Sequence, residues 1–376
     1  MLLRQSFQAN GSNPSIAANW HGSLHDFCRA ALLLTALLPL AVHSQGESAC
    51  ANSDQNCKVP APQRHPVTTL DYWRESFAKP VEQRISVASP EVIDYVTQDN
   101  IKYDIPNRPR IPKLAPDFLR DLQQAFDELP AVIKRLLSSK LAGIMLAEDF
   151  GGTGYGEEIV DRASKSVGAF ILLDSALLDG QTANAWATWK ENTPFKPQSG
   201  YELVAEIEAE SDDNRKNAIQ YILIHELAHV LAIGENIHPS SLIKPKDLQA
   251  TADFPYFSLT WTPPKEGDRY LTRFDAKFPE RKNVVYYFGA KLAGNQMIDV
   301  YNSLEATNMP TLYGVINPHD DWAEAFVTYV HTVLMKKPFR IRLYTDGKLA
   351  KEYKACWTEE RCDHKKKIIE QFLDPR

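Results

Sequence analysis

Apolar and polar positions along the chain alternate in ways that predict helices, a strand and a loop. Leu and Phe recur at helical spacing in residues 116–130 and again in 130–144, and Asp117 is a candidate N-cap of the first helix. The run VGAFILLD at 167–174 is apolar throughout, which is typical of a strand. The glycine-rich stretch EDFGGTGYGEE at 148–158 predicts a loop close to a functional site.

Two further segments, 221–234 and 320–338, are long and mostly apolar and carry a helical pattern, so each predicts a buried helix. Aspartates stand where each helix would begin, and a glycine or a proline stands where it would end. These candidate boundaries are Asp212 or Asp213 and Gly234 for the first helix, and Asp320 or Asp321 and Pro338 for the second.

The composition is that of a globular protein able to bury a sizeable core. Of the 376 residues, 44% are hydrophobic and 24% are charged, a length that allows one large domain or two ordinary ones. The formal net charge of -6 argues against nucleic acid as a partner, because such binders usually present a basic face. We therefore expect no nucleic-acid partner.

The N-terminal region predicts export from the cytoplasm. An apolar core at 30–42 follows Arg29 and ends in small and polar residues near Ser44, as a signal peptide does, and an uncleaved anchor is the weaker alternative. The core is shorter than the about 20 residues that span a bilayer, so we expect no stable membrane span. The predicted organisation is a signal peptide with a long leader at 1–44, a proline-containing arm or pro-like segment at 45–115, and one domain at 116–376.

Four cysteines remain after the predicted signal peptide, and their spacing favours two short disulfide loops. The pairs are Cys50 with Cys57 and Cys356 with Cys362. Disulfides suit an oxidising compartment, which agrees with export. A four-cysteine zinc site is the competing interpretation, although the spacing is not that of C-x2-C pairs.

Three titratable residues interrupt the apolar helix predicted at 221–234. His225 and His229 are four residues apart, so both lie on one helix face and can bind a single Zn²⁺ ion. Glu226 points about 100° away from His225 and can act as general base on a water at that ion. The bland alternative is that the three are core residues with local partners. A buried carboxylate without a partner is costly, which favours the metal site.

A catalytic zinc site needs a third protein ligand and one open position. Glu324 is the preferred candidate, because it lies in the second apolar helix with no obvious partner. Glu235 and His238 are the other candidates. The alternative for Glu324 is a salt bridge to a nearby Arg or Lys.

The order H-E-x-x-H followed far downstream by a glutamate on a helix resembles the gluzincin metallopeptidases. The local DDWAEAF around Glu324 is similar to the glutamate helix of anthrax lethal factor-like catalytic domains. The resemblance covers about residues 165–335. It implies an α+β, zincin-like fold, with a small mixed sheet, an edge strand beside the H-E-x-x-H helix, and a mostly helical C-terminal part.

The resemblance also implies roles for further residues. The strand at 167–174 is a candidate for the edge strand along which a peptide substrate binds, and an ordinary core strand is the equal alternative. Tyr313 is the first candidate to stabilise the oxyanion, with His319 and His331 as alternatives. The aspartate that thermolysin-like enzymes carry four residues after the ligand glutamate is Thr328 here, so the partner of a ligand histidine is one of Asp320, Asp321 and Thr328.

The sequence thus predicts an exported, zinc-dependent peptidase, most simply an endopeptidase. One Zn²⁺ ion held by His225, His229 and Glu324 activates water, Glu226 is the general base, and a peptide or protein is the substrate. Two alternatives stay open: a secreted binding or toxin-like protein with a structural metal site, and a hydrolase of non-peptide amides.

Overall fold

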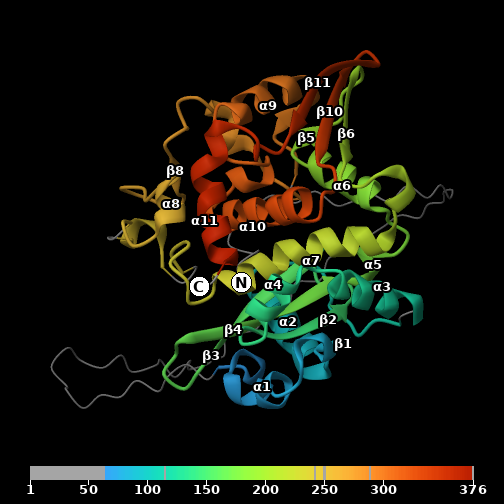
Figure 1. Cartoon of the computed structure of the whole chain (residues 1–376), viewed down its shortest axis with the longest axis vertical. Helices are drawn as coiled ribbons and strands as arrows, with labels where there is room; N and C mark the ends of the chain where they lie inside the picture. Colours follow the sequence, from blue (N-terminus) through green and yellow to red (C-terminus); the bar gives the residue numbers. More distant parts are fainter. Residues whose placement is uncertain (1–63, 114–115, 241–242, 249–250, 288, 375–376) are drawn as a thin grey trace, which may run out of the picture. The chain divides into compact units, whose positions relative to one another are not determined.

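The apolar run at 167–174 forms an inner strand of a four-stranded mixed sheet in the computed structural model, which describes residues 64–113, 116–240, 243–248, 251–287 and 289–374 (Figure 1). The strands lie in the order β1-β2-β4-β3, with β1, β2 and β4 parallel and β3 antiparallel to β4. Every residue of β2 is buried, as expected where both faces of a sheet are covered. The strands are β1 (Ile85–Val87), β2 (Leu141–Ala147), β3 (Gly154–Val160) and β4 (Ser166–Asp174).

Two predictions about this sheet are wrong. Strand β4 is flanked by β2 and β3, so the edge strand is β3, which lies in the segment predicted as a glycine-rich loop. Residues 141–144 end the predicted second helix but begin β2 instead. In both cases pairing with a strand distant in sequence overrides the local pattern.

Helices cover both faces of the four-stranded sheet. On one face, Trp73 of α1 (Leu70–Phe77) and Val92 of α2 (Pro90–Lys102) pack with Phe170 of β4. On the other face, α7 (Arg215–Ala232) packs on β3 and β4 together with α3 (Pro116–Asp127) and α4 (Ala131–Leu137). Figure 1 shows α7 and α1 on opposite sides of the strands.

Residues 65–113 belong to this fold and do not form an arm beside it. Strand β1 extends the sheet by pairing with β2, and residues from His65 onward form one compact unit with the rest of the described chain. The predicted signal peptide and the predicted Cys50–Cys57 bridge lie outside the described residues.

The C-terminal part contains more strands than the mostly helical region we expect from the sequence. An antiparallel sheet has the order β11-β10-β6, formed by β6 (Tyr201–Glu206), β10 (Arg340–Thr345) and β11 (Lys348–Lys354). Two short pairs join β5 (Phe195–Lys196) to β9 (Leu292–Ala293) and β7 (Trp261–Thr262) to β8 (Leu271–Thr272). The remaining helices are α5 (Ser175–Leu178), α6 (Ala183–Asn192), α8 (Pro255–Ser258), α9 (Met297–Glu305), α10 (Pro318–Tyr329) and α11 (Asp363–Leu373).

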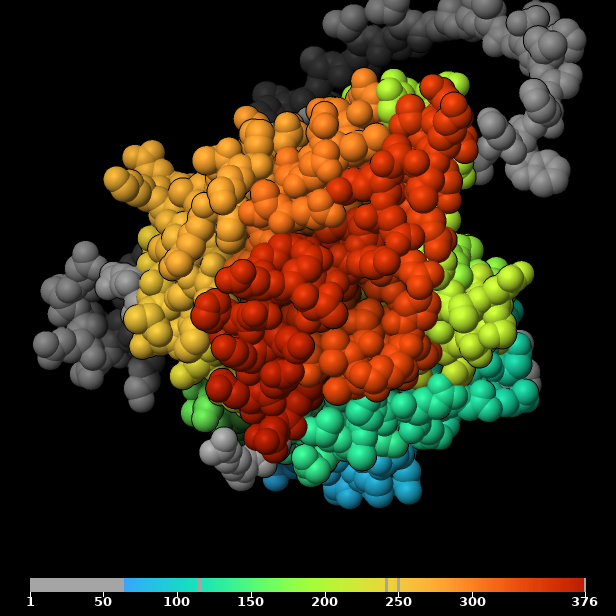
Figure 2. All heavy atoms as spheres, turned by 45° about the horizontal axis from the view of Figure 1, so that its top comes forward, coloured from blue at the N-terminus to red at the C-terminus, as the bar shows by residue number. Residues whose placement is uncertain are grey.

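Helix α11 packs against α10, and the C-terminal residues, coloured red, lie in the middle of the face shown in Figure 2. A disulfide joins Cys356 to Cys362 just before α11, as the sequence predicts. The fully buried Lys365 of α11 donates two hydrogen bonds to Asp321 of α10, both 2.6 Å long. Within the described ranges, a search for helices of membrane-spanning length and hydropathy finds none.

Candidate metal centre

Helix α7 carries the H-E-x-x-H motif through the middle of the protein. Asn214 caps the helix by accepting a hydrogen bond from the amide of Asn217, so the cap is neither of the predicted aspartates. Gly234 follows the helix with a φ of 76°, the left-handed conformation that glycine favours after a helix end. The motif residues His225, Glu226 and His229 are all buried.

Helix α10 crosses next to α7 and supplies the acidic residues. Asn317 caps it by accepting hydrogen bonds from the amides of His319 and Asp320. The helix is held against α7 by Trp322, whose indole donates to the carbonyl oxygen of Ala228 over 2.9 Å. The Asp320 carboxylate, predicted as one of two possible caps, is thereby available to the site.

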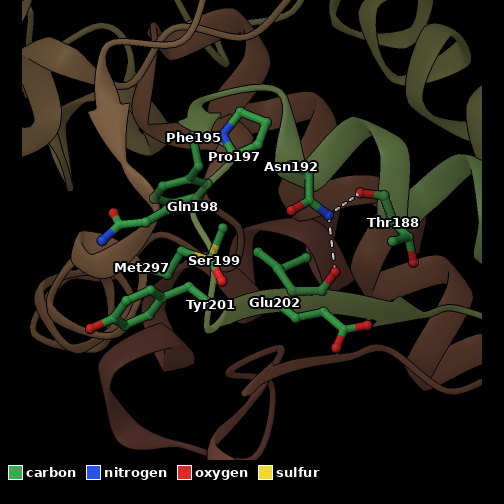
Figure 3. A pocket seen from close by; sticks show the side chains of 10 residues that line it. Thr188, Asn192, Phe195, Pro197, Gln198, Ser199, Tyr201, Glu202 and Met297 are labelled. Atoms are coloured by element: carbon green, nitrogen blue, oxygen red, sulfur yellow. Dashed lines mark hydrogen bonds between the residues drawn. The ribbon is translucent and has the colours of Figure 1, made fainter. Parts of the chain in front are cut away.

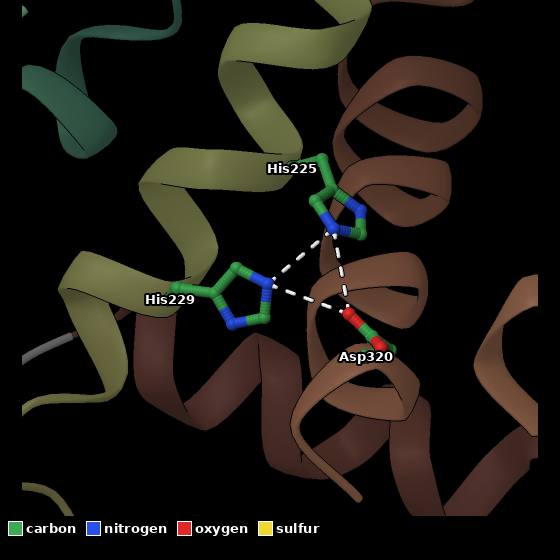
Figure 4. A group of neighbouring side chains, drawn as sticks. All are labelled: His225, His229 and Asp320. Atoms are coloured by element: carbon green, nitrogen blue, oxygen red, sulfur yellow. Dashed lines mark hydrogen bonds and ion pairs between the residues drawn. The ribbon is translucent and has the colours of Figure 1, made fainter. Parts of the chain in front are cut away.

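Three side chains from the two helices converge on one point, as Figure 4 shows. The Nε2 atoms of His225 and His229 are 3.3 Å apart, and they lie 3.8 Å and 3.7 Å from Oδ1 of Asp320. Ligand atoms about 2.0–2.1 Å from a tetrahedral zinc ion lie about 3.3 Å apart, so these spacings suit one ion. The donor set of two imidazoles and one carboxylate is one that zinc accepts.

The chemical state of two of these side chains, Asp320 and His229, also fits a cation. Burial lowers the pKa of the third, His225, but the hydrogen bond and charge of Glu324 outweigh burial and raise it. Oδ1 of Asp320 is buried and has no hydrogen-bond partner among the described residues, and a buried acceptor of this kind is costly unless something occupies it. Burial, followed by the neighbouring His225, lowers the pKa of His229 well below its usual value, so its imidazole is neutral as metal binding requires. Three protein ligands leave a fourth position of a tetrahedral ion open.

Glu324, predicted as the third ligand, occupies a different position. Its Oε1 atom lies 3.0 Å from Nδ1 of His225, on the side of the ring away from the converging Nε2 atoms. The same oxygen accepts a hydrogen bond of 2.9 Å from the buried Lys190 of α6. Asp320 therefore lies at the converging Nε2 atoms, and Glu324 lies at Nδ1 of His225. The salt bridge considered as the alternative for Glu324 is present and joins it to Lys190.

The carboxylates of the site have very different proton affinities. Burial opposes ionisation of Glu324, but the charge of Lys190 and the hydrogen bond from His225 outweigh it and lower its pKa to about 2. Burial raises the pKa of Glu226 to about 7 and that of Asp320 to about 6, in each case against the opposing charge of His225. A carboxyl group with a pKa near neutrality is well suited to take up and return a proton.

The edge strand β3 passes directly over Glu226. A Cβ atom added to Gly154 would overlap the Glu226 carboxylate, whereas one added to Gly156 would lie 3.9 Å from Oε2. Oε2 of Glu226 is buried with no hydrogen-bond partner in the described part of the chain. The glycine-rich segment therefore gives the glutamate room beside the last strand of the four-stranded sheet.

Tyr313 lies beside the candidate metal centre, close to His225 and Lys190. Its ring centroid is 5.7 Å from that of His225, and Nζ of Lys190 lies 4.6 Å from the centre of the Tyr313 ring. Burial, followed by the charge of Asp320, raises its pKa well above the usual value, so the phenol keeps its proton. The hydroxyl can therefore act as a hydrogen-bond donor.

The other residues considered from the sequence lie elsewhere. Glu235 pairs with Lys140 near the surface, and His238 stacks edge-on against His319. Asp321 faces Lys365, as described above. The remaining two contact backbone oxygens: Thr328 donates to the carbonyl of Glu324, and Nε2 of His331 lies 2.6 Å from the carbonyl of Ile207.

Lys190 and Gly154 are site residues that sequence reasoning did not identify. Lys190 lies in a segment whose charged residues have an ordinary helical distribution, so no motif marks it. Gly154 belongs to a run of glycines whose individual roles depend on packing against α7. The glycine-rich sequence at 151–156 indicates a site nearby, but it does not single out Gly154.

A separate surface pocket of about 600 Å³ lies beside α6, β6 and α9 (Figure 3). Asn192 in its wall donates hydrogen bonds to the carbonyl oxygens of Thr188 and Leu203. Its lining residues are all different from those of the metal centre. We therefore locate the candidate chemistry at the metal centre and not in this pocket.

Comparisons with protein-family models, with curated proteins and with solved structures gave no match to this chain.

Proposed function

We propose that this chain is a zinc-dependent peptidase of zincin-like fold in which His225, His229 and Asp320 hold the metal. The observation that carries the proposal is the convergence of three buried ligand atoms beside the buried carboxylate of Glu226. A zinc ion in such a site acts as a Lewis acid that acidifies water and polarises a carbonyl group. The mixed sheet with an antiparallel edge strand next to the H-E-x-x-H helix supports the zincin-like assignment.

Glu226 is the general base in this proposal. It takes a proton from the attacking water and passes it to the nitrogen that leaves when the peptide bond breaks. The buried Oε2 atom, with no hydrogen-bond partner among the described residues, supports this role, because a purely structural metal site has no need of a base.

Other residues position the reactants. Glu324 accepts from Nδ1 of His225 and so keeps Nε2 of that ring free for the metal. The phenol of Tyr313 donates to the oxyanion that forms at the substrate carbonyl. The disulfide between Cys356 and Cys362 supports export of the enzyme to an oxidising compartment.

The test is Glu226→Gln, which keeps the size of the side chain and removes the base. We expect unchanged zinc content and folding, with turnover of a proteome-derived peptide library lowered at least about 10²-fold. Retained turnover would exclude Glu226 as the base. Absence of cleavage by the unmodified, zinc-loaded protein would exclude the peptidase proposal itself.

A further inference from the structure

Two aromatic side chains are exposed to solvent next to the metal centre. Trp189 of α6 is 45% exposed and Tyr287, in the loop after residue 283, is 37% exposed. Their ring centroids are 5.5 Å apart and the ring planes are inclined by 31°. Exposed large aromatic surface is unfavourable in water, and adjacent exposed rings often mark a binding site. We refer to Trp189 and Tyr287 as the aromatic pair.

The aromatic pair is linked to the metal centre through a series of rings. The ring of Tyr287 is 6.1 Å from that of Tyr313, which is itself 5.7 Å from the ring of His225. Partial burial, followed by the negative charges of Glu324 and Glu191, raises the pKa of Tyr287 well above its usual value. The phenol thus lies within the electrostatic range of the acidic groups of the site and stays neutral.

Buried polar contacts fix the position of both rings. The two residues that follow Trp189 on α6 have buried partners: Lys190 donates to Glu324, and Glu191 accepts from the hydroxyl of Tyr286 over 2.8 Å. Tyr286 directly precedes Tyr287, so one turn of helix and one loop hold the pair together. A preformed surface of this kind binds a ligand without the cost of ordering flexible side chains.

The backbone at Tyr287 is also unusual. Its φ of 68° is in the left-handed region, which a bulky residue seldom adopts. Such conformations persist where surrounding contacts impose them, and they are frequent at binding sites. Tyr286, the residue before it, is held by its hydrogen bond to Glu191, and Tyr287 lies beside Trp189.

We infer that the aromatic pair is a specificity site that binds a large apolar side chain, aromatic or leucine-like, of the peptide substrate next to the cleaved bond. This inference rests on the proposed function. Two rings at a shallow angle offer a flat apolar surface that stacks on aromatic side chains and covers aliphatic ones. The pair contributes no charged group of its own, so we expect no preference for lysine over leucine or phenylalanine.

The test measures binding separately from cleavage. Zinc-loaded Glu226→Gln protein is titrated with peptides that carry Ala, Lys, Leu or Phe at one position, and that position is moved along the peptide. At one position, Leu and Phe should bind about tenfold more tightly than Ala. Adding Trp189→Ala, or Tyr287→Asn, which suits a positive φ, should remove this preference. Adding Leu349→Ala, at another exposed apolar residue, should leave it unchanged.

An equal affinity for all four peptides, a preference for Lys, or the same apolar preference after Trp189→Ala would overturn the inference. Cleavage of the same peptides by the unmodified protein is recorded in parallel. An apolar preference in binding without any cleavage counts against the proposed function alone. Cleavage without that preference counts against the specificity site alone.

Discussion

Lys190 provides a buried positive charge whose effect reaches the metal centre through Glu324. It donates to the oxygen that also lies 3.0 Å from Nδ1 of His225, so its removal should loosen the orientation of that ring. We expect Lys190→Met to weaken zinc binding by about 10–100-fold, the usual effect of losing a partner of a metal ligand. Competition with a chelator of known affinity measures this.

Lys337→Met is the matched control for Lys190→Met. Lys337 is also largely buried, and its ammonium group donates to Glu208, Asn217 and Gln220, none of which contacts the metal group. This variant should lose stability but bind zinc normally. Equal loss of zinc affinity in both variants would show that Lys190 acts through general stability and not through His225.

The spacing of residues within one helix predicts part of the candidate site, and the contacts between helices lie outside its reach. The motif pointed to His225, Glu226 and His229, because its spacing places the two histidines on one helix face and the glutamate about 100° away from His225. Asp320 and Glu324 are also four residues apart, so both lie on one face of α10, and spacing alone does not say which carboxylate reaches the histidines. The buried Lys190, which comes from a third helix, decides that assignment by holding Glu324.

At the scale of elements, the packing of β3 on α7 depends on a glycine. The Gly154→Ala methyl group would overlap the Glu226 carboxylate, and the backbone φ at this position does not itself forbid alanine. We expect peptide turnover to fall at least about tenfold through displacement of the base, with zinc content retained. The control is Gly156→Ala, where the new methyl group would lie 3.9 Å from Oε2 of Glu226, an ordinary contact distance. Equal turnover in the two variants would contradict the packing argument.

The same strands show why the sequence predicted helices better than sheets. The hydrophobic pattern at 221–234 lies within one helix and is enough to predict it. Helices α7 and α10 overlap the two segments predicted as buried helices. Strands β2 and β3 both pair with β4. Strand β6 pairs with β10, and the paired residues Glu206 and Arg340 are more than 130 residues apart in the sequence. Alternation within a short segment carries little information about such distant partners.

At the scale of the whole molecule, buried histidines make stability depend on pH. Burial lowers the pKa of His331 to about 4, and its Nε2 lies near the carbonyl oxygens of Ile207 and Pro338. The unfolded chain binds this proton near pH 6.5 and the folded chain only near pH 4, so stability falls as pH decreases through that range. The loss from this residue amounts to about 3 kcal/mol.

Urea unfolding of the metal-free protein between pH 7 and pH 4 measures this effect. His331→Gln should flatten the dependence of the unfolding free energy on pH, although it lowers stability at pH 7. The exposed His364→Gln should leave the dependence unchanged. An unchanged slope in His331→Gln would mean that His331 does not change its proton binding on folding.

The central claim is that Asp320, together with His225 and His229, holds a metal ion. Metal analysis and zinc affinity of the purified protein test it most directly, with Asp320→Ala, Glu324→Ala and Glu235→Ala compared side by side. The account predicts one zinc ion per unmodified chain, loss of zinc in Asp320→Ala, weakened binding in Glu324→Ala, and unchanged binding in Glu235→Ala. Full zinc content in Asp320→Ala, with complete loss in Glu324→Ala, would contradict it and return the third ligand to Glu324.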